Sequence, residues 1–157
     1  MDFALDGVKW WSLIVLDGYS RTMLAGAVAP TEASWVALMV LYTACLRYGA
    51  LGHLISDTGG AYISNEVEAV CTRLGIDHHT IVSTQGASYM HLMETHCNIQ
   101  RRVYDYQFSL TQTPLEFEQA HQRFLQLYTT TAHQGLLQEK CERPIPLDVL
   151  GEARGRR

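Results

Sequence analysis

The sequence of 157 residues has no Cys-x-x-Cys pair, no long apolar run and only 18% charged residues. The longest apolar stretch, 35–45, is too short and too interrupted to span a bilayer, and no basic-then-apolar leader opens the chain. The wide spacing of the cysteines favours buried thiols in a reducing cytoplasm over disulfides or a zinc site. We therefore predict a soluble cytoplasmic protein without a membrane partner, whose free thiols are Cys45, Cys71, Cys97 and Cys141.

Positive charge is also scarce, because the net charge is −4 and the isoelectric point is about 5.9. This balance argues against a protein that binds nucleic acid through bulk charge alone. A content of 47% hydrophobic residues, with three Trp and eight Tyr, excludes a disordered chain or a coiled coil. The length fits one compact domain over residues 1–151, and we expect the basic tail 152–157 to lack regular structure.

Short apolar segments between turn residues predict a mixed α/β domain with the order βββαβαβα. The first three strands are expected to be antiparallel, since a hairpin-length turn joins the second to the third. Thr31 is expected to cap a largely buried helix that ends at Gly49, and Gly75 to close the next helix. Thr113, Pro114 and Glu116 together predict the start of a later helix. The predicted strands are 2–5, 10–16, 22–29, 53–56 and 76–81, and the helices are 31–49, 64–74, 89–108 and one that begins at 113–116.

The segment HLISDTGGAYIS, residues 53–64, ends a short strand at Asp57 and continues into a glycine-rich turn. Ligands of open α/β sheets usually bind at the carboxyl ends of strands, which makes Asp57 a candidate ligand residue. The Asp-x-Gly pattern is also ordinary turn chemistry, so a structural role is the alternative.

A polar stripe is expected on the helix that follows the loop 83–88. Glu94, Asn98, Arg101 and Asp105 recur at helical spacing on one side, and the more apolar side carries Tyr89, Leu92, Met93, Cys97 and Tyr104. Glu94 is either a catalytic carboxylate or a solvated helix residue paired along the same stripe. Arg101 and its neighbour Arg102 either contact DNA phosphates or form part of a solvated face.

This arrangement of Asp2, Asp57 and Glu94 resembles the catalytic core of DDE transposases and retroviral-type integrases. The segments that carry the resemblance are MDFALDG, LIVLDGYSR, LISDTGGAYIS, METHCNIQRR and TTAHQGLLQEKCERPIPLDVLG. Between Asp57 and Glu94 lie 36 residues (94 − 57 − 1), close to the family's spacing. Asp2 fits the strand-turn-strand length to Asp17 better than Asp6, which remains the alternative first acid, and Asp17 is expected to close the hairpin.

The resemblance implies a ribonuclease H-like fold with a mixed sheet of about five strands flanked by helices. It implies that Asp2, Asp57 and Glu94 hold two Mg²⁺ or Mn²⁺ ions, which prefer oxygen ligands and promote in-line displacement at phosphorus. The implied function is DNA cleavage and strand transfer by the transposase/integrase of a bacterial insertion element. A catalytically silent transposase remnant and a ribonuclease H-like nuclease are the alternatives.

The resemblance also implies partners. These are DNA, as transposon ends and target, and further copies of the chain in a homodimer or higher oligomer. Gln85, in the loop that resembles the family's flexible active-site loop, is expected to contact DNA together with Asn98, Arg101 and Arg102. Thr58 stands where the family commonly has Asn, which predicts weaker support of the site because a hydroxyl cannot replace both functions of an amide.

The histidines predict no zinc site, since no paired ligand motif at a standard spacing occurs. The residues considered are His78, His79, His91, His96 and Cys97. His133, in TAHQGL, is expected to make a structural hydrogen bond.

Overall fold

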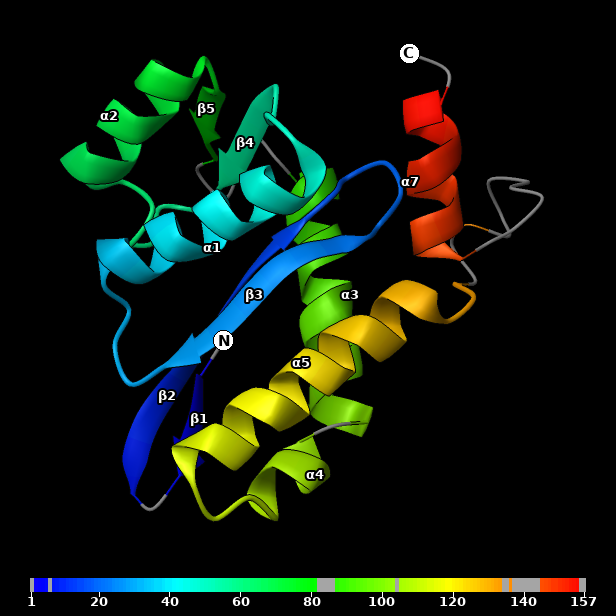
Figure 1. The fold of residues 1–157 in the computed structure, drawn as a ribbon. Helices are drawn as coiled ribbons and strands as arrows, with labels where there is room; N and C mark the ends of the chain where they lie inside the picture. The colour runs from blue at the N-terminus through cyan, green and yellow to red at the C-terminus, as the bar shows by residue number, and fades with distance from the viewer. Residues whose placement is uncertain are drawn as a thin grey trace.

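The computed structural model describes the backbone of residues 2–5, 7–81, 87–103, 105–133, 136 and 145–155; for residues 2, 3, 5, 87–90, 103 and 155 it describes the backbone alone. The chain begins with an antiparallel sheet of three strands in the order β1-β2-β3 (Figure 1). These strands are β1 (Asp2–Leu5), β2 (Val8–Leu16) and β3 (Met23–Ala29), which confirms the predicted antiparallel start.

The turn between β2 and β3 is closed by Asp17, as the sequence predicts. Its Oδ2 accepts hydrogen bonds from the backbone N–H and the hydroxyl of Ser20, both at 2.7 Å. Ser20 is fully buried, and its hydroxyl oxygen also lies 2.9 Å from the Thr22 hydroxyl. Asp17 is therefore engaged in the structure of the hairpin.

A helix, a parallel strand pair and a second helix follow. α1 (Ser34–Tyr48) leads to β4 (His53–Ser56), and α2 (Asn65–Leu74) leads to β5 (Asp77–Thr80), which pairs with β4 in parallel. The Ser64 hydroxyl accepts a hydrogen bond from the Val67 N–H at 3.3 Å at the start of α2. Gly75 ends α2 in the left-handed conformation, with φ of 67°, where glycine carries no Cβ penalty.

The carboxyl-terminal half is helical: α3 (Ala87–Val103), α4 (Asp105–Ser109), α5 (Pro114–Thr130) and α7 (Pro146–Gly155). The predicted start of α5 is confirmed, because the Thr113 hydroxyl accepts a hydrogen bond from the Glu116 N–H at 3.2 Å and Pro114 occupies the first turn. Glu116 in turn accepts from the Gln112 N–H at 2.8 Å. Among the helices that the structure describes, none combines the length and apolar character needed to cross a membrane.

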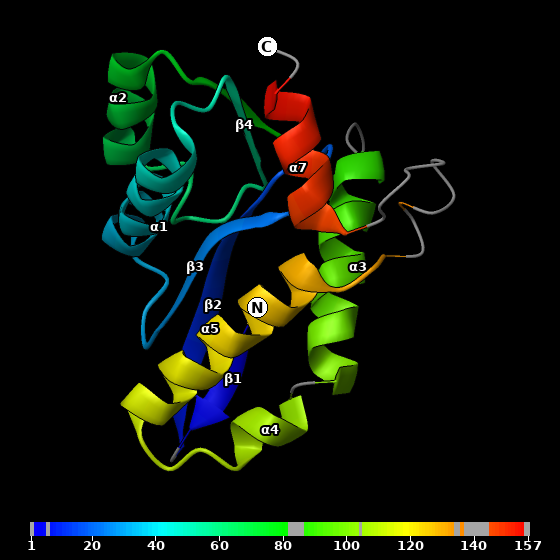
Figure 2. The same cartoon turned by 45° about the vertical axis from the view of Figure 1, so that its right-hand side comes forward.

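The three-stranded sheet separates two hydrophobic cores (Figure 2). Side chains alternate along β2, so Leu13 packs toward α1 and α2 while Trp10 and Ile14 pack toward α4 and α5. Gly26 on β3 permits α5 to approach the sheet, since a Cβ there would lie 2.7 Å from side-chain atoms of Ile14 and Leu125. The result is a helix-sheet-helix sandwich with an apolar core on each side of the sheet.

Several expectations differ from the structure. Within the described residues, no ladder joins β1-β2-β3 to β4-β5, so a single sheet of five strands is not confirmed. The N-cap of α1 is Ala33 without a side-chain cap, so Thr31 was the wrong cap. The helix predicted to run to Phe108 is divided into α3 and α4. α7 continues to Gly155, beyond the expected boundary at residue 151.

The prediction that α1 is largely buried was wrong for one of its faces. Trp35, Met39, Tyr42 and Leu46 lie at helical spacing, and their exposed fractions range from 46% to 71%. Only the opposite side of α1 enters the core, because the sheet covers a single face of the helix. The cysteines that the structure describes, Cys45, Cys71 and Cys97, are free thiols on helices; Cys141 lies outside the described residues.

Candidate functional site

Asp57 follows the last residue of β4 and is exposed, as the sequence predicts for an acid at a strand's carboxyl end. Its Oδ1 accepts a hydrogen bond from the Gly59 N–H at 3.0 Å. A Cβ on Gly59 would lie 2.8 Å from the same oxygen, whereas nothing lies within 4 Å of a Cβ built on Gly60. The turn therefore holds the Asp57 carboxylate, and a side chain at position 59 would have to displace that carboxylate whereas one at position 60 would not.

The electrostatic effect of Asp57 reaches Tyr62, which lies in the core next to this turn. Burial, followed by the charges of Asp57 and Glu32, raises the pKa of Tyr62 to about 12. The phenol consequently remains protonated and neutral beside the acid. Ser56, the last residue of β4, donates to the Asp57 carbonyl at 3.0 Å and so also shapes this turn.

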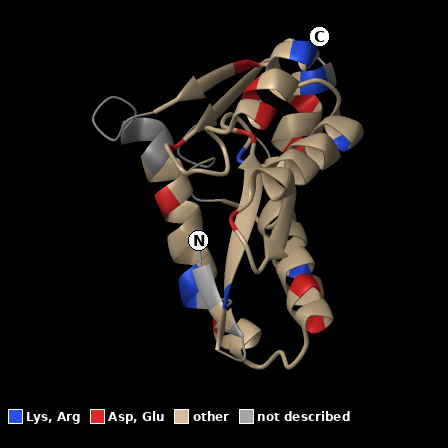
Figure 3. Ribbon diagram, turned by 90° about the vertical axis from the view of Figure 1, so that its left-hand side faces the viewer, with Lys and Arg blue, Asp and Glu red and all other residues tan. Residues whose placement is uncertain are grey.

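Glu94 lies in the middle of α3 and is exposed, as is Asn98 one turn later. Arg101 and Arg102 form the basic last turn of the helix and are exposed as well (Figure 3). Asp105 belongs to α4 and is half-buried, and burial raises its pKa. The predicted polar stripe is therefore solvent-facing from Glu94 to Arg101.

Two predicted site residues are described only in part or not at all. Asp2 is the first residue of β1, where its backbone pairs with Trp11 of β2, and its side chain lies outside the description. Gln85 and the alternative first acid, Asp6, lie outside the described residues. Among the described side chains, no group of three candidate metal ligands includes Asp57 or Glu94.

A different ligand group does occur on the surface of the structure. His53, Asp77 and His79 offer ligand atoms that all lie within 4.8 Å of one another. No sequence motif marks this group, because its members are brought together by the pairing of β4 with β5. His78, a neighbour of His79 in the sequence, has a buried side chain on the opposite face of β5.

The buried face of α3 also differs from the expected apolar stripe, since its fully buried members are His96 and Gln100. The His96 ring packs against Phe124 and Tyr128, with ring centroids 5.3 and 5.0 Å away. Gln100 is its polar neighbour one turn along, but neither ring nitrogen has a well-formed hydrogen bond within the described residues. Burial lowers the pKa of His96 to about 4, so its imidazole is neutral near pH 7.

A second buried histidine lies on α5 beneath the sheet. His121 Nε2 and the Ser12 hydroxyl are 2.7 Å apart, and the ring is fully buried. Burial lowers the pKa of His121 to about 3. His133, by contrast, hydrogen-bonds the Tyr128 carbonyl at 2.8 Å, in agreement with its predicted structural role. These histidines belong to the core and to helix termination.

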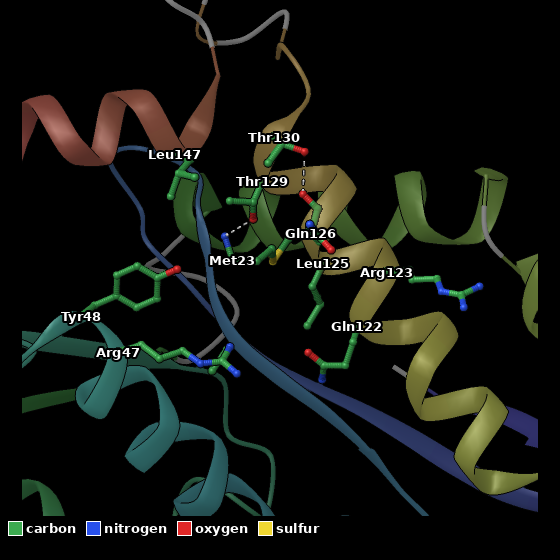
Figure 4. Close-up of a pocket in the computed structure, with 11 residues that line it drawn as sticks. Met23, Arg47, Tyr48, Gln122, Arg123, Leu125, Gln126, Thr129, Thr130 and Leu147 are labelled. Carbon is green, nitrogen blue, oxygen red and sulfur yellow. Dashed lines mark hydrogen bonds between the residues drawn. The ribbon is translucent and has the colours of Figure 1, made fainter.

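A hollow of about 420 Å³ lies beside β3, between α1 and α5, and includes Leu147 of α7 (Figure 4). Its lining combines apolar side chains with Arg47, Arg123 and Gln122. The Met23 N–H at its wall donates to the Thr129 hydroxyl at 3.2 Å. Neither Asp57 nor Glu94 lines this hollow, so it is separate from the predicted acidic site.

The sequence matches no family model and no curated protein. Solved structures, in contrast, are similar in fold. A chain of the simian T-cell lymphotropic virus intasome complex superposes with a TM-score of 0.75 at 19% identity, covering 96% of this chain; this chain spans about half, 51%, of that one. The BIV integrase catalytic core gives a TM-score of 0.72 at 18% identity and covers 99% of this chain and 93% of its own.

The HTLV-2 integrase catalytic core, solved in complex with magnesium as a trimeric form, gives a TM-score of 0.68 at 19% identity. That superposition covers 85% of this chain and 84% of the HTLV-2 chain. The chain therefore has the ribonuclease H-like fold of retroviral integrase catalytic cores.

Proposed function

We propose that this chain is the catalytic core of a DDE-type polynucleotidyl transferase that cleaves and joins DNA in a bacterial insertion element. Asp2, Asp57 and Glu94 are its proposed catalytic carboxylates. The observation that carries the proposal is the position of Asp57, an exposed acid held by the Gly59 N–H at the carboxyl end of β4 in an integrase-core fold. In open α/β sheets this edge is the usual place for a reactive site.

The residues at this edge fit a hard divalent cation. Asp57 uses one oxygen for the Gly59 N–H and keeps its second oxygen for a ligand, while Gly59 adds no Cβ beside it. Oxygen donors of this kind suit Mg²⁺ or Mn²⁺. We assign the cations to Asp2, Asp57 and Glu94; when bound, two such ions supply activation of the attacking oxygen and stabilisation of the leaving oxygen.

The rest of α3 is proposed to position DNA. Arg101 and Arg102 are exposed on the last turn, where guanidinium groups can pair with phosphates. Asn98 is exposed one turn after Glu94 and can donate and accept hydrogen bonds, and Gln85 is proposed to act from the preceding loop. Because the net charge is −4, these local contacts and not bulk charge must supply the affinity.

The chain is also proposed to act as a homodimer or higher oligomer. Trp35, Met39, Tyr42 and Leu46 form an exposed apolar stripe along α1, which would gain free energy by burial against another copy. Leu46→Glu is expected to increase the monomer fraction in light scattering coupled to gel filtration. The matched control is Leu110→Glu, since Leu110 is exposed to a similar degree, 63% against 71%, and lies outside the stripe. Equal dimer fractions in wild type and Leu46→Glu would contradict this interface.

Calorimetric titration with Mn²⁺ tests the proposed catalytic site. Wild type is expected to bind Mn²⁺, and Asp57→Asn is expected to lose that binding because the amide removes the anionic ligand. Glu66→Gln is the control, since Glu66 is an exposed acid on α2 that belongs to neither candidate metal site. Mn²⁺ binding that does not depend on Asp57 would contradict the enzyme proposal and leave the silent remnant as the better description.

Strand transfer by a longer protein that includes a DNA-binding region separates a transposase from a simple nuclease. Joined products that depend on Asp57 and Glu94 support the proposal. Cleaved DNA without joined products would indicate a ribonuclease H-like nuclease instead.

A further inference from the structure

Two histidines and one aspartate share the outward face of the β4-β5 pair. In the parallel ladder, His53 pairs with Asp77 and Ile55 pairs with His79. Because side chains alternate between the two faces of a strand, these four positions face the same way. All three potential ligands are exposed, whereas Leu54, at an intervening position of β4, packs on the core.

His78, on the opposite face of β5, is excluded from this group of potential ligands. His78 Nε2 lies 3.0 Å from the Ser56 hydroxyl, and its Nδ1 lies 3.4 Å from Glu68 of α2. Its side chain is only 3% exposed. The pleat therefore separates consecutive histidines, so that His78 is fixed beneath α2 and His79 stands on the open face.

The outward group has ligand atoms already close to one another. Asp77 Oδ2 lies 2.9 Å from His79 Nε2 and 3.4 Å from His53 Nδ1. The two imidazole rings are nearly parallel, with centroids 6.2 Å apart and an interplanar angle of 21°. Ligand atoms about 2.0–2.2 Å from a tetrahedral Zn²⁺ lie about 3.4 Å apart, so the 3.4 Å pair already has this spacing and the 2.9 Å pair would have to open by about half an ångström. Two imidazole nitrogens and one carboxylate oxygen supply three of the four ligands of a tetrahedral Zn²⁺, and the cation would replace the direct contacts of the two rings with Asp77.

We propose that His53, Asp77 and His79 form a binding site for a divalent transition-metal ion, with Zn²⁺ as its probe. Imidazole nitrogen and one carboxylate oxygen suit Zn²⁺ and are poor ligands for Mg²⁺, which prefers oxygen alone. Each histidine binds as the neutral tautomer whose proton is on the nitrogen that faces away from Asp77. The exposure of the group leaves the fourth position to water.

This site is independent of the proposed catalytic carboxylates. Its ligands are the first residue of β4 and the first and third residues of β5, whereas Asp57 follows the last residue of β4. Bound Zn²⁺ would link the two strands directly and so stabilise the parallel pair, because a ligand that binds only the folded state shifts the unfolding equilibrium. The proposal therefore predicts both stoichiometric binding and a higher unfolding temperature.

Zn²⁺ titration of the whole chain, purified without a histidine tag, tests this site by calorimetry and by thermal unfolding. Wild type is expected to bind one equivalent and to unfold at a higher temperature with Zn²⁺ than without it. His79→Ala and His53→Ala, on different strands, are each expected to weaken binding by at least about 10-fold, since loss of even an outer-shell partner costs that much. Both variants are expected to lose the Zn²⁺-dependent rise in unfolding temperature.

Controls keep the result specific to this group. His91→Ala removes another exposed histidine, on α3, and is expected to bind Zn²⁺ as wild type does. Asp57→Asn is expected to keep Zn²⁺ binding even if it loses Mn²⁺, so failure of one site is distinguishable from failure of the other. Absence of one-equivalent binding by wild type, or wild-type affinity in both His53→Ala and His79→Ala, would overturn the proposal.

Discussion

The two ends of the β4-β5 pair carry different candidate sites that are assembled in different ways. His53 and Asp77 begin the two strands, and with His79, the third residue of β5, they come together through one ladder, with ligand atoms within 4.8 Å. At the other end, Asp57 stands after β4, while its proposed partners Asp2 and Glu94 belong to β1 and α3. A ladder between neighbouring strands therefore builds a site from local pairing, whereas the acidic site depends on how three separate elements pack.

The largest expected effect comes from replacing, in separate variants, the aspartate at each end of the β4-β5 pair by asparagine. In strand transfer by the longer protein, Asp57→Asn is expected to lower the rate on the order of 100-fold or more, the scale for removing one preorganised charged group. Asp77→Asn is expected to leave that rate unchanged and to weaken Zn²⁺ binding instead. If both variants lost strand transfer equally, the two ends would not be functionally separate.

The two ends of the β4-β5 pair can be compared only at pH values where the protein stays folded, and two buried histidines set the lower limit of that range. The pKa values of His96 and His121 are lowered to about 4 and about 3, against about 6.5 in an unfolded chain. The unfolded state therefore takes up protons first, and stability falls as pH drops below about 6.5 toward these folded-state values. Between pH 7 and pH 5 the loss is of the order of 1–2 kcal/mol per histidine.

Urea unfolding at both pH values measures this loss. His96→Leu is expected to reduce the pH dependence, because its imidazole lacks a well-formed hydrogen bond and packs among aromatic rings. His91→Ala, which removes an exposed imidazole, is the control and is expected to preserve the wild-type slope. A slope unchanged in His96→Leu would contradict the neutral buried state of His96.

Gly59→Ala tests the site at the carboxyl end of β4 while keeping the Asp57 carboxylate. The added Cβ would lie 2.8 Å from Asp57 Oδ1 and must displace the carboxylate, so Mn²⁺ binding is expected to weaken about 10-fold, as when a group that orients a metal ligand is lost. Gly60→Ala is the matched control, since its Cβ would meet nothing within 4 Å. Calorimetry of both variants measures the difference, and equal affinities would show that the turn does not position Asp57.

Thr58→Asn has the smallest expected effect. An amide at this exposed position can donate and accept hydrogen bonds, and it is expected to strengthen Mn²⁺ binding by less than about 1 kcal/mol, the net value of one hydrogen bond. Zn²⁺ affinity is expected to stay constant, because the change lies at the other end of the pair. Weaker Mn²⁺ binding in Thr58→Asn would indicate that the threonine already supports the site.

Local chemistry made much of the fold predictable. Ser64, Gly75 and Thr113 mark helix ends through contacts within a few residues of themselves, so the sequence alone predicts these ends. Asp17 was identified as a hairpin residue for the same reason. The exposed face of α1 could not be predicted, because Trp35 and Leu46 are apolar and only the packing of the sheet decides which helix face is covered.

The sequence by itself determined the order of strands and helices, the turn at Asp57 and the glycine next to it, since these depend on neighbouring residues. It also determined the acid spacing that resembles an integrase core, and the similarity of solved integrase cores supports that fold. Only the tertiary structure decided that His53 lies against Asp77 and that His78 is buried while His79 is exposed. The physical reason is register, because pairing between distant strands and the alternation of the pleat determine which side chains meet.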